Sequence, residues 1–214
     1  HQARIDCLFA SRANPRKEPQ SLVVFRWIRN GRNGKWYVFY HRLTHKSDYS
    51  RQACAEKITV NPDGSIDQVE ITSCGLNNGA LIAKGSYPAG IACNITNGNM
   101  PHGCNSIYTE SFPNVTNSGE ERYIGEIADG TLIGYKYFSF ENTKKLSVLI
   151  RSTGSGKLTA YSDMGTTQAA EFEIKPESDW TKLTAELSIP DGVYPLYFIY
   201  KGTGLLDMME IEFE

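Results

Sequence analysis

The chain has 214 residues, of which 40% are hydrophobic, and it carries 22 Lys and Arg against 24 Asp and Glu, a net charge of −2. This composition suffices for one large or two small domains with a buried core, and it argues against wholesale disorder. No run of about 18 apolar residues occurs, so the sequence predicts no membrane-spanning helix.

The first 40 residues contain one clear element. Residues 1–33 match no pattern that can be assigned. Asn33-Gly34 is a strong hairpin-turn signal. It precedes aromatic and β-branched residues at positions 36–40, and such a run predicts a buried strand.

A hairpin is predicted around Asn61-Pro62-Asp63-Gly64, which has turn chemistry at every position. Its two strands are expected at residues 57–60 and 66–71. Residues 75–104 are rich in Gly and Asn, contain two prolines, and are predicted to be loops.

The pattern becomes regular beyond residue 105. Hydrophobic alternation and turn signals such as Asp129-Gly130 and Asp191-Gly192 recur every 8–12 residues, which is typical of a β-sandwich or jelly roll. No segment has a helical period over three turns, so the sequence predicts an all-β protein. The expected strands are 123–127, 132–140, 146–151, 156–162, 170–174, 181–187, 192–200 and 206–213.

The charge is unevenly divided along the chain. Residues 1–104 carry 13 Lys and Arg against 7 Asp and Glu, whereas residues 105–214 carry 9 against 17. Such a shift predicts two units that meet at residues 104–105. The basic residues form no dense stripe with stacking aromatics, so we expect a solvated surface and no nucleic-acid partner.

All five cysteines lie in the first 104 residues, and none belongs to a Cys-x-x-Cys pair, so a zinc site is poorly supported. A disulfide between Cys74 and Cys93 is compatible with the sequence, and buried free thiols are equally compatible with it.

Two stretches resemble known families. Residues 36–42, 49–56, 68–76 and 87–94 hold phrases such as Trp36-Tyr37-Val38-Phe39-Tyr40 and Ser50-Arg51-Gln52, in an order similar to the last part of the five-bladed propeller of family 43 glycoside hydrolases. Residues 105–214, with Gly130-Thr131-Leu132-Ile133-Gly134-Tyr135, are similar to the β-sandwich of family 6 carbohydrate-binding modules.

The resemblance implies an incomplete β-propeller-like segment over residues 1–104 and a carbohydrate-binding-module-like sandwich over residues 105–214. The family's catalytic trio, two aspartates and a glutamate, comes from earlier blades, and about 100 residues cannot build five blades. We therefore assign no catalytic residue in this chain. An incomplete propeller leaves open strand edges, so we expect a homodimer through those edges.

Family 6 modules hold a sugar ring against aromatic side chains, with polar groups fixing its orientation. The resemblance places Trp180 in the corresponding loop-to-strand region and puts Glu126 where the family has a tyrosine. Tyr123 and Tyr135 are the other candidate contacts. Trp180, Tyr123 and Tyr135 could each pack in the core instead of contacting a sugar.

These modules also commonly hold a structural calcium ion, which prefers carboxylate and other oxygen ligands. Glu110 and Asp207 match the family's first-strand and last-strand carboxylates. The alternative for both is a plain surface carboxylate.

The sequence thus favours a non-catalytic module that binds plant cell-wall polysaccharide, of the xylan or arabinoxylan type, outside a bacterial cell or at its surface. Two alternatives stay open. One is the C-terminal piece of a family 43 arabinofuranosidase or xylosidase, and the other is a structural or interaction sandwich without a ligand.

Overall fold

The computed structural model describes residues 26–30, 35–98 and 112–214, and these segments are almost entirely β-strand. Their single helical element is the short 3-10 turn η1 (Ala89–Ile91). The predicted all-β fold is therefore confirmed. None of the described helical segments is long and apolar enough to cross a membrane.

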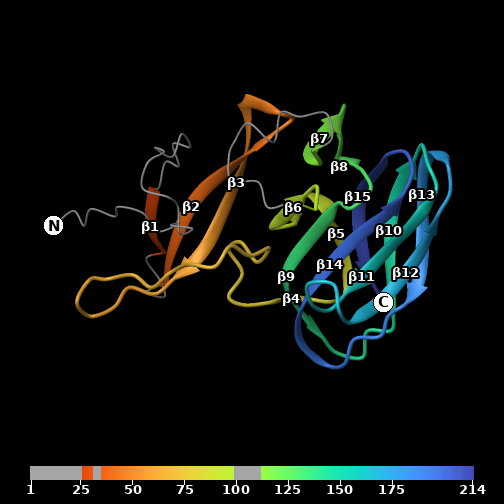
Figure 1. Cartoon of the computed structure of the whole chain (residues 1–214). Helices are drawn as coiled ribbons and strands as arrows, with labels where there is room; N and C mark the ends of the chain where they lie inside the picture. Colours follow the sequence, from red (N-terminus) through yellow and green to blue (C-terminus); the bar gives the residue numbers. More distant parts are fainter. Residues whose placement is uncertain (1–25, 31–34, 99–111) are drawn as a thin grey trace.

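Two six-stranded sheets face each other and form the sandwich on the right of Figure 1. Sheet I has the order β13-β10-β15-β8-β7, with β5 also paired to β15. Its strands are β13 (Glu177–Glu186), β10 (Lys145–Ser152), β15 (Leu206–Phe213), β8 (Glu121–Ile127), β7 (Asn114–Ser118) and β5 (Gly85–Pro88).

Sheet II has the order β12-β11-β14-β9-β4, with β6 also paired to β9. Its strands are β12 (Gln168–Ile174), β11 (Gly156–Tyr161), β14 (Gly192–Gly202), β9 (Leu132–Phe140), β4 (Leu81–Ile82) and β6 (Asn94–Thr96). All eight strands expected beyond residue 105 are present, and the largest boundary difference is at β13, which begins at Glu177 instead of 181.

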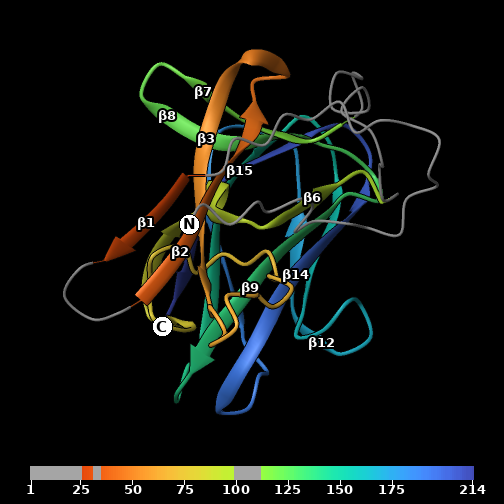
Figure 2. The same cartoon turned by 90° about the vertical axis from the view of Figure 1, so that its left-hand side faces the viewer.

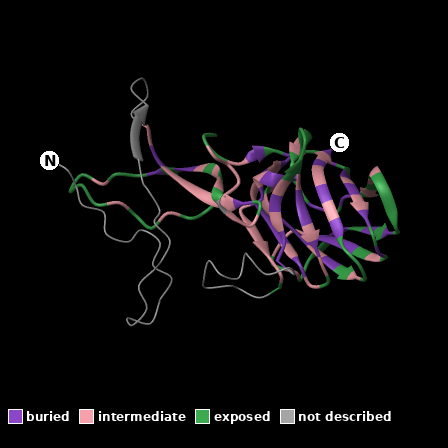
Figure 3. Ribbon diagram, turned by 90° about the horizontal axis from the view of Figure 1, so that it is seen from above, coloured by how far each residue is buried: buried purple, intermediate pink, exposed green. Residues whose placement is uncertain are grey.

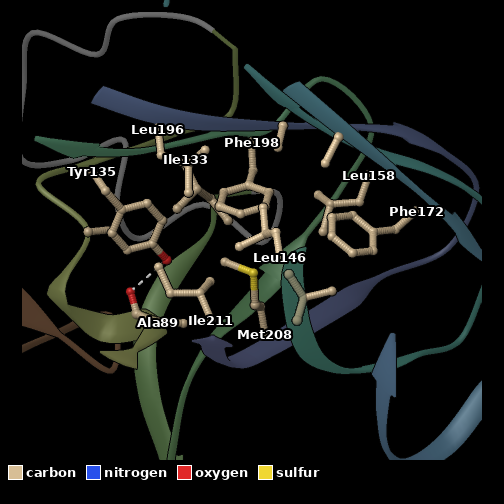
Figure 4. Close-up of a cluster of buried hydrophobic side chains, with 14 of the residues drawn as sticks. Ala89, Ile133, Tyr135, Leu146, Leu158, Phe172, Leu196, Phe198, Met208 and Ile211 are labelled. Atoms are coloured by element: carbon tan, nitrogen blue, oxygen red, sulfur yellow. Dashed lines mark hydrogen bonds between the residues drawn. The ribbon is translucent and has the colours of Figure 1, made fainter. Parts of the chain in front are cut away.

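The core lies between the two sheets because each strand turns alternate residues inward. Figure 3 shows the resulting alternation of buried and exposed residues along the sandwich strands. In β15, for example, Leu206, Met208, Ile211 and Phe213 are at most 1% exposed. Burial of each such side chain contributes about 1.5–3 kcal/mol. Figure 4 shows part of this core, including Phe198 of sheet II above Met208 of sheet I.

A third, three-stranded sheet lies before the sandwich, at the left of Figure 1. It consists of β1 (Arg26–Asn30), β2 (Lys35–Thr44) and β3 (Ser47–Ile58), all antiparallel. The strand predicted at 36–40 lies in the first half of β2, while the turn signal at 33–34 lies outside the described residues. In the described part of the chain β1 and β3 each have one unpaired edge, and dimerisation through such edges stays a prediction.

The predicted hairpin at residues 57–71 is correct at its turn and wrong in its second strand. The Gly64 N–H donates to Asn61 O at 2.9 Å, and one bridge joins Val60 to Ile66. Beyond this bridge no strand forms up to residue 71. The segment instead leads toward the sandwich, because Glu70 accepts hydrogen bonds from Lys136 and Tyr137 of β9.

Residues 75–104 also depart from the loops that were predicted, because β4, β5 and β6 lie within them. β4 and β6 pair with β9, and β5 pairs with β15. A division of the chain at residues 104–105 stays a prediction. In the described residues, however, three strands that precede this position are hydrogen-bonded to strands that follow it.

Arg42 joins the three-stranded sheet to the sandwich. Its Nε and Nη2 donate to Gln52 Oε1 at 3.0 and 2.8 Å, and its two Nη groups also donate to the carbonyl oxygens of Gly90 and Ala92. Gln52 Nε2 donates to Gly90 O at 3.1 Å. Burial lowers the pKa of Arg42, and its donors are matched by neutral acceptors. The carbonyl oxygens of the η1 turn and the Gln52 amide thus fix the position of the Arg42 guanidinium.

We expect Arg42→Met to weaken this junction, because it removes the guanidinium donors to the Gly90 and Ala92 carbonyls and leaves only the Gln52 amide at Gly90. Hydrogen bonds to a charged group contribute about 1.5–3 kcal/mol each, so a loss of about 2 kcal/mol is expected. Hydrogen exchange should quicken in residues 35–58 and stay slow in the β10 and β15 core. The exposed Arg51→Met is the matched control, and equal protection in both variants would contradict this role.

Glu56 is a buried carboxylate, 3% exposed, that anchors residue 72 to β3. It accepts hydrogen bonds from Tyr40 OH at 3.0 Å, from the Thr72 N–H at 2.8 Å and from Thr72 Oγ1 at 2.6 Å. Burial raises the pKa of Glu56 above its usual value, and the bonds from Thr72 and Tyr40 oppose this rise.

A raised pKa means that the folded protein keeps a proton at pH values where the unfolded chain has lost it. The free energy of unfolding should therefore fall as the pH rises from about 4.5 through the raised pKa of Glu56. In Glu56→Gln this fall should be smaller than in the parent chain. Urea unfolding between pH 4.5 and 8 measures it, with the exposed Glu141→Gln as control. Identical slopes in all three proteins would contradict the assignment.

Candidate functional site

Two of the aromatic side chains singled out from the sequence touch on the outer face of sheet I. Tyr123 of β8 and Trp180 of β13 are both half-buried, and their ring centroids lie 5.4 Å apart with an interplanar angle of 63°. Trp180 Nε1 donates to Glu121 Oε2 at 2.9 Å. The rings therefore meet edge to face and are fixed by a hydrogen bond at one end.

Arg151 of β10 lies against both rings. Its Cζ is 4.8 Å from the centroid of Tyr123 and 4.5 Å from that of Trp180, within the range of a cation–π contact. Its neighbours Ile150 and Ser152 are buried, so alternation turns Arg151 outward. The guanidinium therefore lies against both rings, and both aromatic residues remain partly exposed.

Asp207 completes this cluster from the adjacent strand. It is the cross-strand partner of Arg151, and Arg151 Nε donates to Asp207 Oδ2 at 2.9 Å. The Glu126 N–H donates to Asp207 Oδ1 at 3.2 Å. Both carboxylate oxygens of Asp207 thus accept N–H donors, and the carboxylate fixes the position of the guanidinium.

Glu126 links the cluster to the three-stranded sheet. Its backbone φ is 60°, a left-handed conformation that is uncommon outside glycine. Its carboxylate forms an ion pair with Lys46, from the turn between β2 and β3. At the same turn the His45 N–H donates to Val115 O at 2.9 Å. We call Tyr123, Glu126, Arg151, Trp180 and Asp207 the Trp180 patch.

Comparison with known proteins gives a relative by sequence. The chain is 37% identical over 185 residues to a xylosidase/arabinosidase of Thermoclostridium stercorarium. The match covers 80% of this chain and 38% of the relative, so the chain spans well under half of that protein's length. No model of a protein family matches the sequence.

Solved structures add the fold. A family 43 arabinoxylan arabinofuranohydrolase from Bacillus subtilis matches 85% of this chain and 39% of its own, with a TM-score of 0.53 and 18% identity. A family 6 module of Clostridium stercorarium, solved with cellobiose, matches 64% of this chain and 98% of its own (TM-score 0.52, 13% identity). Another family 6 module, from Clostridium cellulolyticum with xylose, gives a TM-score of 0.51 at 14% identity.

The resemblance predicted from the sequence is thereby confirmed. This chain is a relative of a xylosidase/arabinosidase. Its fold matches the C-terminal segment of a family 43 glycoside hydrolase followed by a family 6-like sandwich.

Within the family 6-like sandwich, Tyr135 does not reach the surface. It is 0% exposed, its OH donates to Ala89 O at 3.0 Å, and its ring lies 6.0 Å from that of Phe198 (Figure 4). The prediction that Tyr135 contacts sugar is therefore wrong. Its actual role is to bind the η1 turn to the core.

The predicted calcium site receives no support from the described residues. Glu110 lies outside them. Asp207 is bonded to a guanidinium and an amide N–H, an environment that does not fit a calcium ligand. In the described segments no three His, Cys, Asp or Glu side chains gather around a common point. Calcium binding stays an untested prediction.

Of the three described cysteines, Cys74 and Cys93 are unbonded to each other, and each contacts a backbone carbonyl of β9. Cys93 Sγ donates to Gly134 O at 3.3 Å and Cys74 Sγ to Lys136 O at 3.5 Å. The structure thus holds both as free thiols.

We expect Arg151 and Asp207 to be energetically coupled. In a double-mutant cycle of Arg151→Ala and Asp207→Asn, the coupling should be about 0.5–1 kcal/mol, since the pair is partly exposed. Urea unfolding of the four proteins measures it. Arg151→Lys keeps the charge without the planar fork and should recover only part of the stability. Additive single effects would show that the pair contributes nothing to folding.

Proposed function

We propose that the sandwich is a non-catalytic carbohydrate-binding module of a protein that acts on plant cell-wall xylan or arabinoxylan. The observation that carries this proposal is the contact between Tyr123 of β8 and Trp180 of β13, two half-buried aromatic rings from different strands of sheet I. The fold of family 6 modules and the xylosidase/arabinosidase relative support it. Since the polymer lies outside cells, the proposal includes an extracellular or cell-surface location.

The patch offers one stacking surface for a sugar rather than a slot between two parallel rings. The C–H face of a pyranose or furanose packs well on an aromatic ring, while carboxylates and guanidinium groups bind its hydroxyls. Because Arg151 lies against both rings, the sugar would stack on the part of the Trp180 ring that Arg151 and Tyr123 leave open, with Glu121 beside it. A single stacking contact implies modest affinity, which is sufficient when a polymer offers many repeats.

Titration with xylohexaose and arabinoxylan oligosaccharides tests this proposal. We expect Trp180→Ala to lower the affinity at least tenfold, about 1.4 kcal/mol, because it removes the stacking surface. Tyr49 is 96% exposed and belongs to β3 of the three-stranded sheet, outside the Trp180 patch, so Tyr49→Ala is the aromatic control and should bind as the parent does. Isothermal titration calorimetry and affinity electrophoresis give the constants.

A folded chain that binds none of these sugars would sink the proposal and favour a structural or interaction sandwich. The junction at Arg42 and the Lys46–Glu126 ion pair favour such a supporting role as the second candidate, since both fix the sandwich to the three-stranded sheet. In that case the chain would act as the C-terminal part of an arabinofuranosidase or xylosidase.

A further inference from the structure

A second candidate site lies at the seam between the three-stranded sheet and the sandwich. A cavity of about 320 Å³ is bounded by the end of β3, by residues 67–80 and by Tyr137 of β9. This volume is at the lower end of the range for small-ligand pockets, which is about 300–1,000 Å³. It suits one or two monosaccharide units.

The walls of this seam cavity are held in place by hydrogen bonds. Tyr37 OH donates to Leu76 O at 3.2 Å, and both the backbone N–H and the side-chain Nδ2 of Asn77 donate to Cys74 O, at 3.0 and 3.1 Å. The Thr72 N–H and hydroxyl are bound to Glu56. Because these hydrogen bonds already order the wall, ligand binding costs it little conformational entropy.

Three carboxylates line the cavity, those of Glu56, Asp67 and Glu70, and hydrogen bonds to donors around the cavity already order those of Glu56 and Glu70. Glu56 is bonded to hydroxyl and amide donors only, with no cation among its hydrogen-bond partners. Glu70 accepts from Lys136 Nζ at 2.9 Å and from Tyr137 OH at 3.0 Å. Each carboxylate oxygen has more than one lone pair, so both groups can accept a further hydrogen bond from a ligand.

Three other lining side chains make no hydrogen bond or ion pair with the described residues: Lys57, Gln68 and Asn78. They bring an ammonium group and two amides to the same cavity. Amides both donate and accept, as sugar hydroxyls do, and the Tyr137 ring adds an apolar surface at the wall.

This chemistry selects one class of ligand. An anion would face the carboxylates of Glu56, Asp67 and Glu70, and an apolar molecule would leave the free amides unsatisfied. A neutral polyhydroxylated ring satisfies carboxylates, amides and ammonium together. We propose that the seam cavity is a second saccharide site, which binds one or two neutral pentose units independently of the Trp180 patch.

The test is a titration of the full chain with xylobiose and arabinobiose, followed by amide chemical shifts. Shifts should appear at Thr72, Gly75 and Gly79, which line the cavity. The double variant Gln68→Ala/Asn78→Ala removes two exposed amides that hold no wall in place, so it should lower affinity at these amides about tenfold. Exposed Gln168→Ala on β12 is the matched control and should change nothing.

Trp180→Ala separates this site from the patch. If the seam cavity is a saccharide site, its amide shifts persist in Trp180→Ala even when binding at the patch is lost. Absence of shifts at the cavity amides at saturating sugar, or an unchanged affinity in the double variant, would overturn the inference. Shifts produced by a small amine such as ethylamine and not by either sugar would assign the carboxylates to a cation instead.

Discussion

Strand β9 is the element on which both parts of the molecule depend, because it is hydrogen-bonded along both edges. One edge pairs with β14, and the other receives β6, the Cys93 N–H and β4 in turn. Figure 2 shows β9 beside β14 with β6 crossing at its other end. An uncovered edge of this length would offer a template for pairing with another chain. Residues 73–96 cover it, and this brings the three-stranded sheet against the sandwich.

One glycine makes this arrangement possible. At Gly134 a Cβ atom would lie 2.6 Å from Cε1 of Tyr197, closer than such atoms approach, and a tight 3.1 Å from Cβ of Asn94. The Tyr197 ring therefore packs directly on the β9 backbone while β6 pairs beside it. A side chain at this position would push away either the ring or the covering strand.

The regular strands of the sandwich could be predicted because alternation records burial on one face. β15 and β13 are clear cases, with outward charges between inward apolar residues. β4, β5 and β6 have two to four residues each and lie in a Gly- and Asn-rich segment, so they exist only through tertiary pairing with β9 and β15. Local sequence carries almost no signal for strands of this kind.

The site was predictable only where a family resemblance named residues. The resemblance named Trp180, Tyr123 and Glu126, which the structure places in one patch. Nothing in the sequence indicated Arg151, whose role follows from its outward position on β10. The prediction for Tyr135 failed because the side of β9 that faces the core changes along the strand. In its first part the odd-numbered Ile133 and Tyr135 are buried, and in its last part the even-numbered Phe138 and Phe140 are buried. The change coincides with a register shift in the pairing with β14, opposite residues 194–196. A one-residue shift of this kind reverses which residues face the core.

The positions of Lys46 and Arg42 connect these observations. Lys46 is at the tip of the β2–β3 turn and pairs with Glu126, a member of the Trp180 patch, while Arg42 lies further back in β2 and holds the η1 turn. Tyr135 binds that same turn from inside the core. The three-stranded sheet is therefore attached to the sandwich at the patch and at the turn beneath it. A displacement of this sheet would change the surroundings of Glu126, so the Trp180 patch and the junction between the two parts are physically one structure.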